Sequence, residues 1–303
     1  MAPVGITLSN SSSFASTAKT VIAAHIYARA NNAVMTNVVK PYMQPQGSAV
    51  TNFGTVARVA ASALTEGVDL SAPEQLAVKI TSTNPTEKGV IVFVTYKLQR
   101  ESSYPIDGIV ARVLADAGKK KIDDDGITQV DSFAKSVPGA SSTLDITHFR
   151  GAMAYMSTDN DTAYGPAPMP RVAVLHPEQI SDIVLSLGTP ATGNVEFSGG
   201  WSQEIVQNWL RGRDKVYGTA VFEDGGIARD TNSDAKGAVF AATTQANPPN
   251  GALFYATEKE PRVQSESDMS LRGDEVGSFW DDQWGEMVDP WGVELFSDAG
   301  ATI

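Results

Sequence analysis

Cysteine is absent from this chain of 303 residues. The protein therefore has no disulfide bond, no thiol nucleophile and no thiolate ligand for a metal ion. Histidine is scarce as well: His25, His148 and His176 lie far apart, and none has a second histidine at the spacing of a metal site. These absences predict a fold that rests on packing alone, with no metal site and no cofactor.

Long apolar runs are also missing. Nowhere do eighteen apolar residues follow one another, and the first twenty residues lack a basic start followed by an apolar stretch. Segments of these two kinds mark a transmembrane helix and a secretory signal peptide. We therefore expect no contact with a membrane and a chain made in the cytoplasm.

Motifs for nucleotide binding and hydrolysis do not occur either. The glycine pairs at 199–200 and 225–226 stand outside any GxGxxG or P-loop pattern, and no GxSxG elbow is present. The acidic runs "DDDG" (123–126) and "DNDTAYG" (159–165) lack the sixth glycine and twelfth glutamate of a calcium loop. We expect both runs to be solvated turns, and the chain offers no catalytic residues of these types.

The formal net charge is −12, but the two signs are unevenly distributed. The first 65 residues hold four bases, Lys19, Arg29, Lys40 and Arg58, and the first acid is Glu66. Residues 201–303 hold eighteen acids and eight bases. Because nonspecific DNA binding rests on lysine and arginine, we expect the body of the protein to repel DNA and only the basic segment to tolerate it. A bias that only favours solubility is the alternative.

The first third of the sequence reads as an arm followed by a long hairpin. Residues 14–42 carry only a ragged apolar stripe, which predicts an arm with helical pieces that packs on something else. Residues 55–64 are expected to be extended. After a polar loop, residues 76–98 return and lead into a buried strand at Val90–Tyr96, with "NPTEKG" as a turn.

The rest of the chain mixes helices and strands. Residues 104–121 form the clearest amphipathic helix, about 25 Å long. Its apolar face comprises Ile106, Ile109, Val110, Val113, Leu114 and Ala117. We expect a second helix at 144–156, a strand and a helix at 171–187, and strands within 214–224 and 236–245. This order predicts an α+β fold and not a regular βαβ alternation.

His176 stands where the apolar strand "RVAVL" meets a helix that begins at Pro177. Ligand sites in open α/β sheets lie at the carboxyl ends of strands, so one alternative is a soluble α+β enzyme that uses His176 and nearby carboxylates. We favour a structural role, because proline suits the first helical position and an imidazole before it can hydrogen-bond at the open helix end.

Three tryptophans, Trp280, Trp284 and Trp291, crowd into an acidic segment near the C-terminus. Large aromatics beside charges are enriched in protein interfaces, but they can equally close the core of the chain itself. The candidate interface residues from charge and aromatic content are Lys19, Arg29, Lys40, Arg58, Glu66, Trp280, Trp284 and Trp291.

The order of these parts resembles the major capsid proteins of tailed bacteriophages, which have the Hong Kong 97-type fold. The resemblance rests on "ALTEGVDL" (63–70), "VLADAGKKKID" (113–123), "RVAVLHPEQISDI" (171–183) and the ending "DMSLRGDEVGSFWDDQWGEMVDPWGVELFSDA" (268–299). It implies an N-terminal arm (1–50), an extended loop (51–89), a peripheral domain with a long spine helix (90–143, with a return segment at 251–303) and an axial domain (144–250).

The resemblance also implies a structural protein, not an enzyme, that assembles with copies of itself into the pentamers and hexamers of an icosahedral head. Such a shell is assembled in the cytoplasm of a host bacterium and becomes part of the virion. It encloses double-stranded DNA without sequence-specific binding, and scaffold, portal and decoration proteins are further partners. An encapsulin-like compartment shares the fold and is the rival interpretation.

Some shells of this class are cross-linked through a lysine of the extended loop. This chain has no lysine between Val50 and Val78, and Lys79 comes only on the returning limb. The sequence therefore predicts a shell that closes without covalent bonds.

Overall fold

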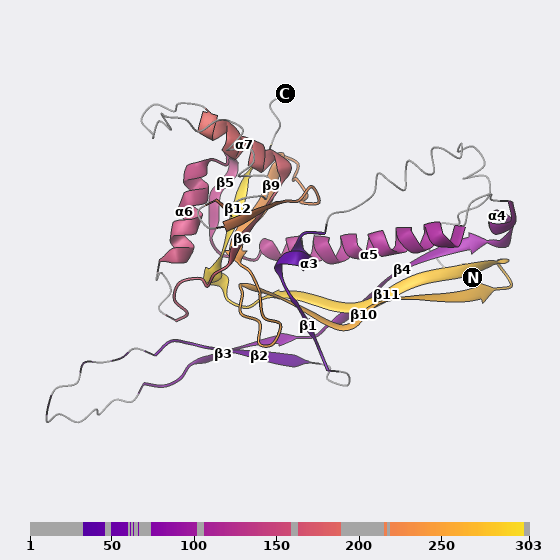
Figure 1. Ribbon diagram of the computed structural model, residues 1–303, viewed down its shortest axis with the longest axis horizontal. Coiled ribbons are helices and arrows are strands. Elements are labelled where there is room, and N and C mark those ends of the chain that lie inside the picture. The colour runs from indigo at the N-terminus through magenta and orange to yellow at the C-terminus, as the bar shows by residue number, and fades with distance from the viewer. Residues whose placement is uncertain are drawn as a thin grey trace.

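The chain folds into two parts that meet at one end of a long helix, α5 (Ile106–Val130) (Figure 1). The computed structural model describes residues 33–45, 50–59, 61, 63, 66, 74–101, 106–158, 163–188, 215–216 and 219–299. One part is an elongated layer of α5 on a four-stranded sheet, and the other is a six-stranded sheet with two helices. The mixture of helices and strands confirms the expected α+β class.

The four-stranded sheet lies along α5. Its strands, in spatial order, are β1 (Pro41–Met43), β10 (Leu253–Asp268), β11 (Gly273–Glu286) and β4 (Thr86–Thr95). The short helix α4 (Tyr96–Glu101) follows β4. Buried positions of α5 recur every four residues, which is the spacing of one helix face: Val110, Leu114, Gly118, Ile122, Gly126 and Val130.

Helix α5 is longer than the sequence predicts. Its 25 residues span about 37 Å at 1.5 Å per residue, and they include the "DDDG" run that was expected to be a solvated turn. That expectation is wrong because two lysine–aspartate pairs one helical turn apart satisfy Asp124 and Asp125, while Asp123 is buried. Val113, expected on the apolar face, is 41% exposed.

The six-stranded sheet holds the second part together. Its strands, in spatial order, are β5 (Ser136–Thr143), β12 (Gly292–Asp298), β9 (Asp234–Ala241), β6 (Arg171–Leu175), β8 (Thr219–Glu223) and β7 (Lys215–Val216). Helices α6 (Ile146–Ser157) and α7 (Pro177–Gly188) pack beside it. The helix expected at 144–156 and the strand and helix expected from Arg171 are confirmed.

The composition of this sheet differs from the ranges expected for the axial domain. Strands β5 and β12 belong to sequence ranges that the resemblance placed in the peripheral domain, yet both pair within the six-stranded sheet. Strand β12 pairs with β9 over seven residues, from Gly292 opposite Phe240 to Asp298 opposite Asp234. The last strand of the chain therefore returns to the second part instead of ending on the first.

The expected long hairpin is confirmed, with different limits. Strand β2 (Thr51–Val56) pairs antiparallel with β3 (Val78–Thr83), and the hairpin projects from the body (Figure 1). Of the expected "NPTEKG" turn only Asn84 and Pro85 lie outside strands, because β4 already begins at Thr86 and pairs with β11. Strand β4 is buried only near its end, at Phe93 and Val94.

The expected arm also ends earlier than residue 50. Helix α3 (Met35–Val38) buries Met35 completely, Val39 is equally buried, and β1 pairs with β10 in parallel. Val34, Met35, Val38, Val39 and Tyr42 are thus part of the core, where replacement of a buried Met by Ala costs about 2–5 kcal/mol. The earlier portion, with Lys19 and Arg29, lies outside the described residues.

Candidate assembly surface

The hairpin of β2 and β3 has one face against the body. Residues directly opposite in an antiparallel pair point to the same side, so Phe53 and Thr81 share the inner face. The ring of Phe53 is buried, with ring centroids 5.0 Å from Tyr42 and 5.5 Å from Phe254. This aromatic cluster attaches the base of the hairpin to the rest of the chain.

Polar contacts hold the same base. Thr83 donates its hydroxyl to Oε1 of Gln44 over 3.2 Å in a buried position, and Lys79 Nζ lies 3.5 Å from the carbonyl oxygen of Met287. The single lysine of the returning limb is therefore in contact with its own chain. These contacts, with the aromatic cluster, fix the direction in which the hairpin projects.

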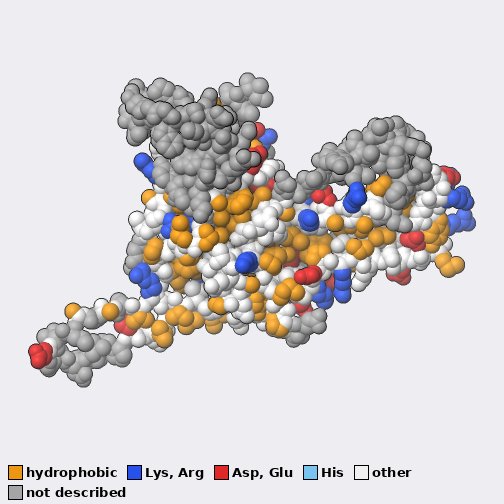
Figure 2. Space-filling model, viewed as in Figure 1, with side chains coloured by type: hydrophobic (Ala, Val, Ile, Leu, Met, Phe, Trp, Pro, Cys, Tyr) orange, Lys and Arg blue, Asp and Glu red, His pale blue; other side chains and the backbone are white. Residues whose placement is uncertain are grey.

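Part of the outer face of the hairpin is apolar although it points to solvent, while the same face carries the polar pair Asn52 and Ser82. Val56, Val78 and Ile80 are 55%, 54% and 64% exposed, and cross-strand pairing places all three on this face. Figure 2 shows hydrophobic side chains along the projecting hairpin. Leu76, just before β3, is 64% exposed as well. Contiguous apolar surface of this kind marks a site of protein association, so this face is the candidate assembly surface.

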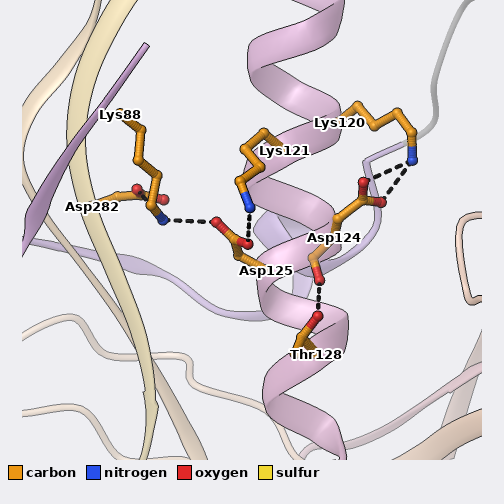
Figure 3. A network of polar contacts seen from close by, with 7 residues as sticks. All are labelled: Lys88, Lys120, Lys121, Asp124, Asp125, Thr128 and Asp282. Carbon is orange, nitrogen blue, oxygen red and sulfur yellow. Dashed lines mark hydrogen bonds and ion pairs between the residues drawn. The ribbon is translucent and has the colours of Figure 1, made fainter.

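A partly buried ionic network joins β4, β11 and α5 (Figure 3). Lys88 of β4 lies between two carboxylates: Nζ is 2.7 Å from Oδ2 of Asp125 on α5 and 2.6 Å from Oδ1 of Asp282 on β11. Lys121 also contacts Asp125 at 2.7 Å. One lysine thus ties two neighbouring strands to the long helix.

The environment of this network shifts its pKa values. Burial alone would lower the pKa of Lys88, but the hydrogen bonds and charges of Asp125 and Asp282 outweigh it and raise that pKa. Burial raises the pKa of Asp282, whose side chain is fully buried, more than Lys88 lowers it. Lys88 is therefore the cation that lets Asp282 remain inside the chain.

Three of the other predicted interface residues lie in the described part of the chain. Lys40, between α3 and β1, is exposed, as are Arg58 after β2 and Glu66 in the hairpin loop. The backbone of Arg58 donates to the carbonyl of Ala163 over 2.7 Å. That these three side chains contact a neighbouring subunit stays a prediction.

The tryptophans separate into two groups. Trp280 and Trp284 are 3% and 6% exposed, and Trp284 stacks on Tyr255 with ring centroids 4.5 Å apart. Glycines of α5 leave room for them: a Cβ at Gly126 would lie 3.1 Å from Trp284. The interface expectation is wrong for these two, because the long helix covers their rings.

Trp291 lies in the short 3₁₀ helix η2 (Asp289–Trp291) and is half-buried. Its Nε1 donates to the carbonyl oxygen of Gly165 over 3.1 Å. The side chain thus connects η2 to the loop before β6. That Trp291 contacts a neighbouring subunit stays a prediction.

His176 has the structural role that we favoured. It is 9% exposed, and its Nδ1 accepts a hydrogen bond from the backbone N–H of Glu178 over 3.2 Å, while Gln179 Oε1 accepts from the His176 N–H over 3.1 Å. Burial lowers the pKa of His176, which keeps the imidazole neutral and able to accept. The ring therefore caps the open start of α7.

We expect His176→Ala to cost about 0.5–2 kcal/mol of stability, as loss of a helix cap does. Because burial lowers the folded pKa of His176, its contribution is present above the ordinary pKa near 6.5 and is lost as pH falls below it. Guanidinium unfolding at two pH values checks both statements. His148→Ala is a matched control, since His148 is only half-buried. A loss above about 4 kcal/mol would contradict a capping role.

The described residues hold no group of three or more histidine, aspartate or glutamate side chains suited to a metal ion. The "DNDTAYG" run lies mostly outside the described residues. Within the described ranges, no helix is long and apolar enough to cross a membrane.

Comparisons with known proteins then show the fold. No family model matches the sequence, and no curated protein matches it either. A chain of the capsid of Ralstonia phage GP4 is 11% identical, with coverage of 92% of both chains and a TM-score of 0.63. A chain of the capsid structure of Cyanophage P-SCSP1u is 12% identical, with coverage of 88% of both chains and a TM-score of 0.63.

The holo-SrpI encapsulin complex from Synechococcus elongatus is similar too. One of its chains is 9% identical, with coverage of 86% of both chains and a TM-score of 0.58. Phage capsids dominate the structures that match. The chain therefore has the Hong Kong 97-type fold of these shell proteins, and the resemblance drawn from the sequence is confirmed at the level of the fold.

Proposed function

We propose that this chain is the major capsid protein of a tailed phage, a structural subunit that assembles with copies of itself into a closed shell. The observation that carries the proposal is a projecting hairpin with an exposed apolar face on a chain that has a shell-protein fold. Repeated modest contacts stabilise a closed lattice, because release of one subunit breaks several of them at once. We assign the chain no enzymatic role and no cofactor.

The proposed shell is an icosahedral head of pentamers and hexamers around double-stranded DNA. Its peripheral part is the α5 layer, its axial part is the six-stranded sheet, and the β2–β3 hairpin is its extended loop. It is assembled in the host cytoplasm and becomes part of the virion, where scaffold, portal and decoration proteins are further partners. DNA is enclosed without sequence-specific binding.

The charge distribution supports weak contact with DNA. Among the described acids of residues 201–303, five side chains are buried inside the chain: Asp224, Asp234, Asp281, Asp282 and Glu294. The remaining acids of this region still outnumber its eight bases, and this balance disfavours contact with phosphate. In this proposal the basic N-terminal portion, with Lys19 and Arg29, is the part of the subunit that approaches DNA.

A compartment shell that packages a protein is the second candidate, because an encapsulin complex shares the fold over 86% of this chain. Electron microscopy of the expressed full chain tests both candidates, since regular closed particles are expected from each. Particles that co-purify with a portal and take up DNA support the capsid. A homogeneous monomer at high concentration would contradict any shell.

We predict that Ile80→Asp abolishes regular particles while the subunit stays folded. Ile80 is 64% exposed, so its own chain loses little, and an exposed change of this kind usually alters stability by about 0.5 kcal/mol or less. A charge in an apolar contact costs about 2 kcal/mol or more at each interface, and the lattice repeats that cost. Negative-stain images and circular dichroism of the same sample provide the two readouts.

Ile80→Leu is the matched control, because it keeps the apolar contact and nearly the same volume. It is expected to assemble like the wild type. Wild-type yields of regular particles from Ile80→Asp would show that this hairpin face makes no contact between subunits.

A further inference from the structure

The two parts of the chain meet where α5 passes the turn between β8 and β9, and two carboxyl groups face each other there. Asp123 of α5 is 1% exposed and Asp224 of the turn is 4% exposed. Their side chains interact directly with each other. A carboxylate accepts hydrogen bonds but does not donate them, so such a contact is favourable only if one of the two groups carries a proton.

Each carboxyl group also accepts hydrogen bonds from nearby backbone N–H groups. Asp123 Oδ1 accepts from the backbone N–H groups of Val34 and Met35 over 2.9 and 2.8 Å, which anchors helix α3 on α5. Asp224 Oδ1 accepts from the N–H of Gly226 over 2.7 Å. Oδ2 of Asp224 is buried and receives a hydrogen from no donor in the described part of the chain.

Among the residues that the structure describes, the charged groups around the pair do not supply a counter-ion. On α5, Lys120 is exposed and pairs with Asp124 at 2.8 Å. Lys119 faces a neighbouring cavity that Glu223 of β8 also lines. At the β6–α7 junction, Arg229 pairs with Glu178 at 2.6 Å, and His176 interacts with Asp224 and Glu223. Helix α3 has no ionisable side chain either, so within the described part of the chain the pair has no compensating cation.

We propose that Asp123 holds a proton and donates it in a hydrogen bond to Asp224, and that this hydrogen bond ties the β8–β9 turn to helix α5 so that the junction between the two parts of the subunit loosens as pH rises. The device is a property of the folded subunit and does not depend on its assembly into a shell. Two acceptors that are each held by backbone N–H groups cannot turn away from each other without moving the segments that carry them.

The direction of the pH dependence follows from the pair. Burial raises the pKa of Asp123 to about 7, and the charge of Asp224 adds to it. The same carboxyl group has an ordinary pKa near 3.9 once the junction opens. The stabilisation is therefore complete below about pH 4, declines as pH rises, and is lost above about pH 7, where Asp123 ionises in the closed junction as well.

Hydrogen–deuterium exchange on the full chain tests the proposal. In the wild type, protection factors at residues 219–227 are expected to fall by up to about tenfold per pH unit between pH 5 and pH 7, and to level off above that. In Asp224→Asn the amide donates permanently to Asp123, so the protection there is expected to stay flat. Helix α6 serves as an internal reference within each sample.

Asp123→Asn is the second variant, because its Oδ1 still accepts from Val34 and Met35 and its amide donates to Asp224. Asp124→Asn is the matched control, since it removes a half-buried carboxylate one residue away that pairs with Lys120, and it is expected to keep the wild-type pH dependence. A wild-type protection that does not change with pH would overturn the proposal. The same pH dependence in the wild type and in a folded Asn variant would overturn it too.

Discussion

Leu114→Asp is expected to yield insoluble or unfolded protein. Leu114 is fully buried on α5, where Val94, Leu98 and Val110 surround it under the four-stranded sheet. Burial of a carboxylate without a partner costs several kcal/mol, and the whole stability of a domain is only about 5–15 kcal/mol. Soluble yield and the thermal midpoint of any soluble fraction are the measurements.

Val113→Asp is the matched control on the same helix. Val113 is 41% exposed, so the same new charge remains in water there, and a change of about 1 kcal/mol or less is expected. The helix propensity of the two variants is similar, so the difference between them reports burial. A Leu114→Asp protein with a wild-type melting temperature would show that this face of α5 is not covered.

Lys88→Met is expected to cost about 3–5 kcal/mol, the range for removal of one partner from a buried ion pair. The substitution keeps most of the side-chain volume but leaves the fully buried Asp282 without the cation 2.6 Å away. Asp282 must then be protonated or exposed, and the contact of β4 and β11 with α5 weakens. Guanidinium unfolding of the variant measures the loss.

Lys121→Met is the control for this prediction. Lys121 contacts Asp125 on the surface, with 55% of its side chain exposed, and such pairs contribute about 0–1 kcal/mol. Adding Asp282→Leu to Lys88→Met is expected to restore part of the lost stability, because it removes the uncompensated charge. A loss below 1 kcal/mol in Lys88→Met would mean that water reaches Asp282.

Local patterns in the sequence were sufficient for several elements. The three- and four-residue spacing of apolar residues from Ile106 to Ala117 predicted the long helix, and Pro177 after an apolar run predicted the strand and helix around His176. Helix α6 also appeared where it was expected, with Asp145 as its N-cap. These features depend on residues that are close together in the sequence, so local sequence patterns are sufficient to predict them.

The candidate assembly surface was not found in the sequence, although a signal was present. Alternation in "TNFGTV" and "VKITST" places Phe53 on one face and Val56, Val78 and Ile80 on the other. The charge and aromatic content of the sequence indicated the tryptophans instead. Both hairpin faces carry apolar residues, so the pattern alone does not distinguish the face that packs on the body from the face that stays exposed.

By itself, the sequence determined the α+β class, the absence of thiol chemistry, the long amphipathic helix and the order of parts typical of a shell protein. Only the tertiary structure decided that Asp123 is a buried anchor and not a turn residue, that Trp280 and Trp284 belong to the core, and that the segment around Met35 is part of the body. The physical reason is that burial depends on segments far apart in the chain. Asp123 meets Met35 and Asp224 across 88 and 101 residues, and no local periodicity records such a contact.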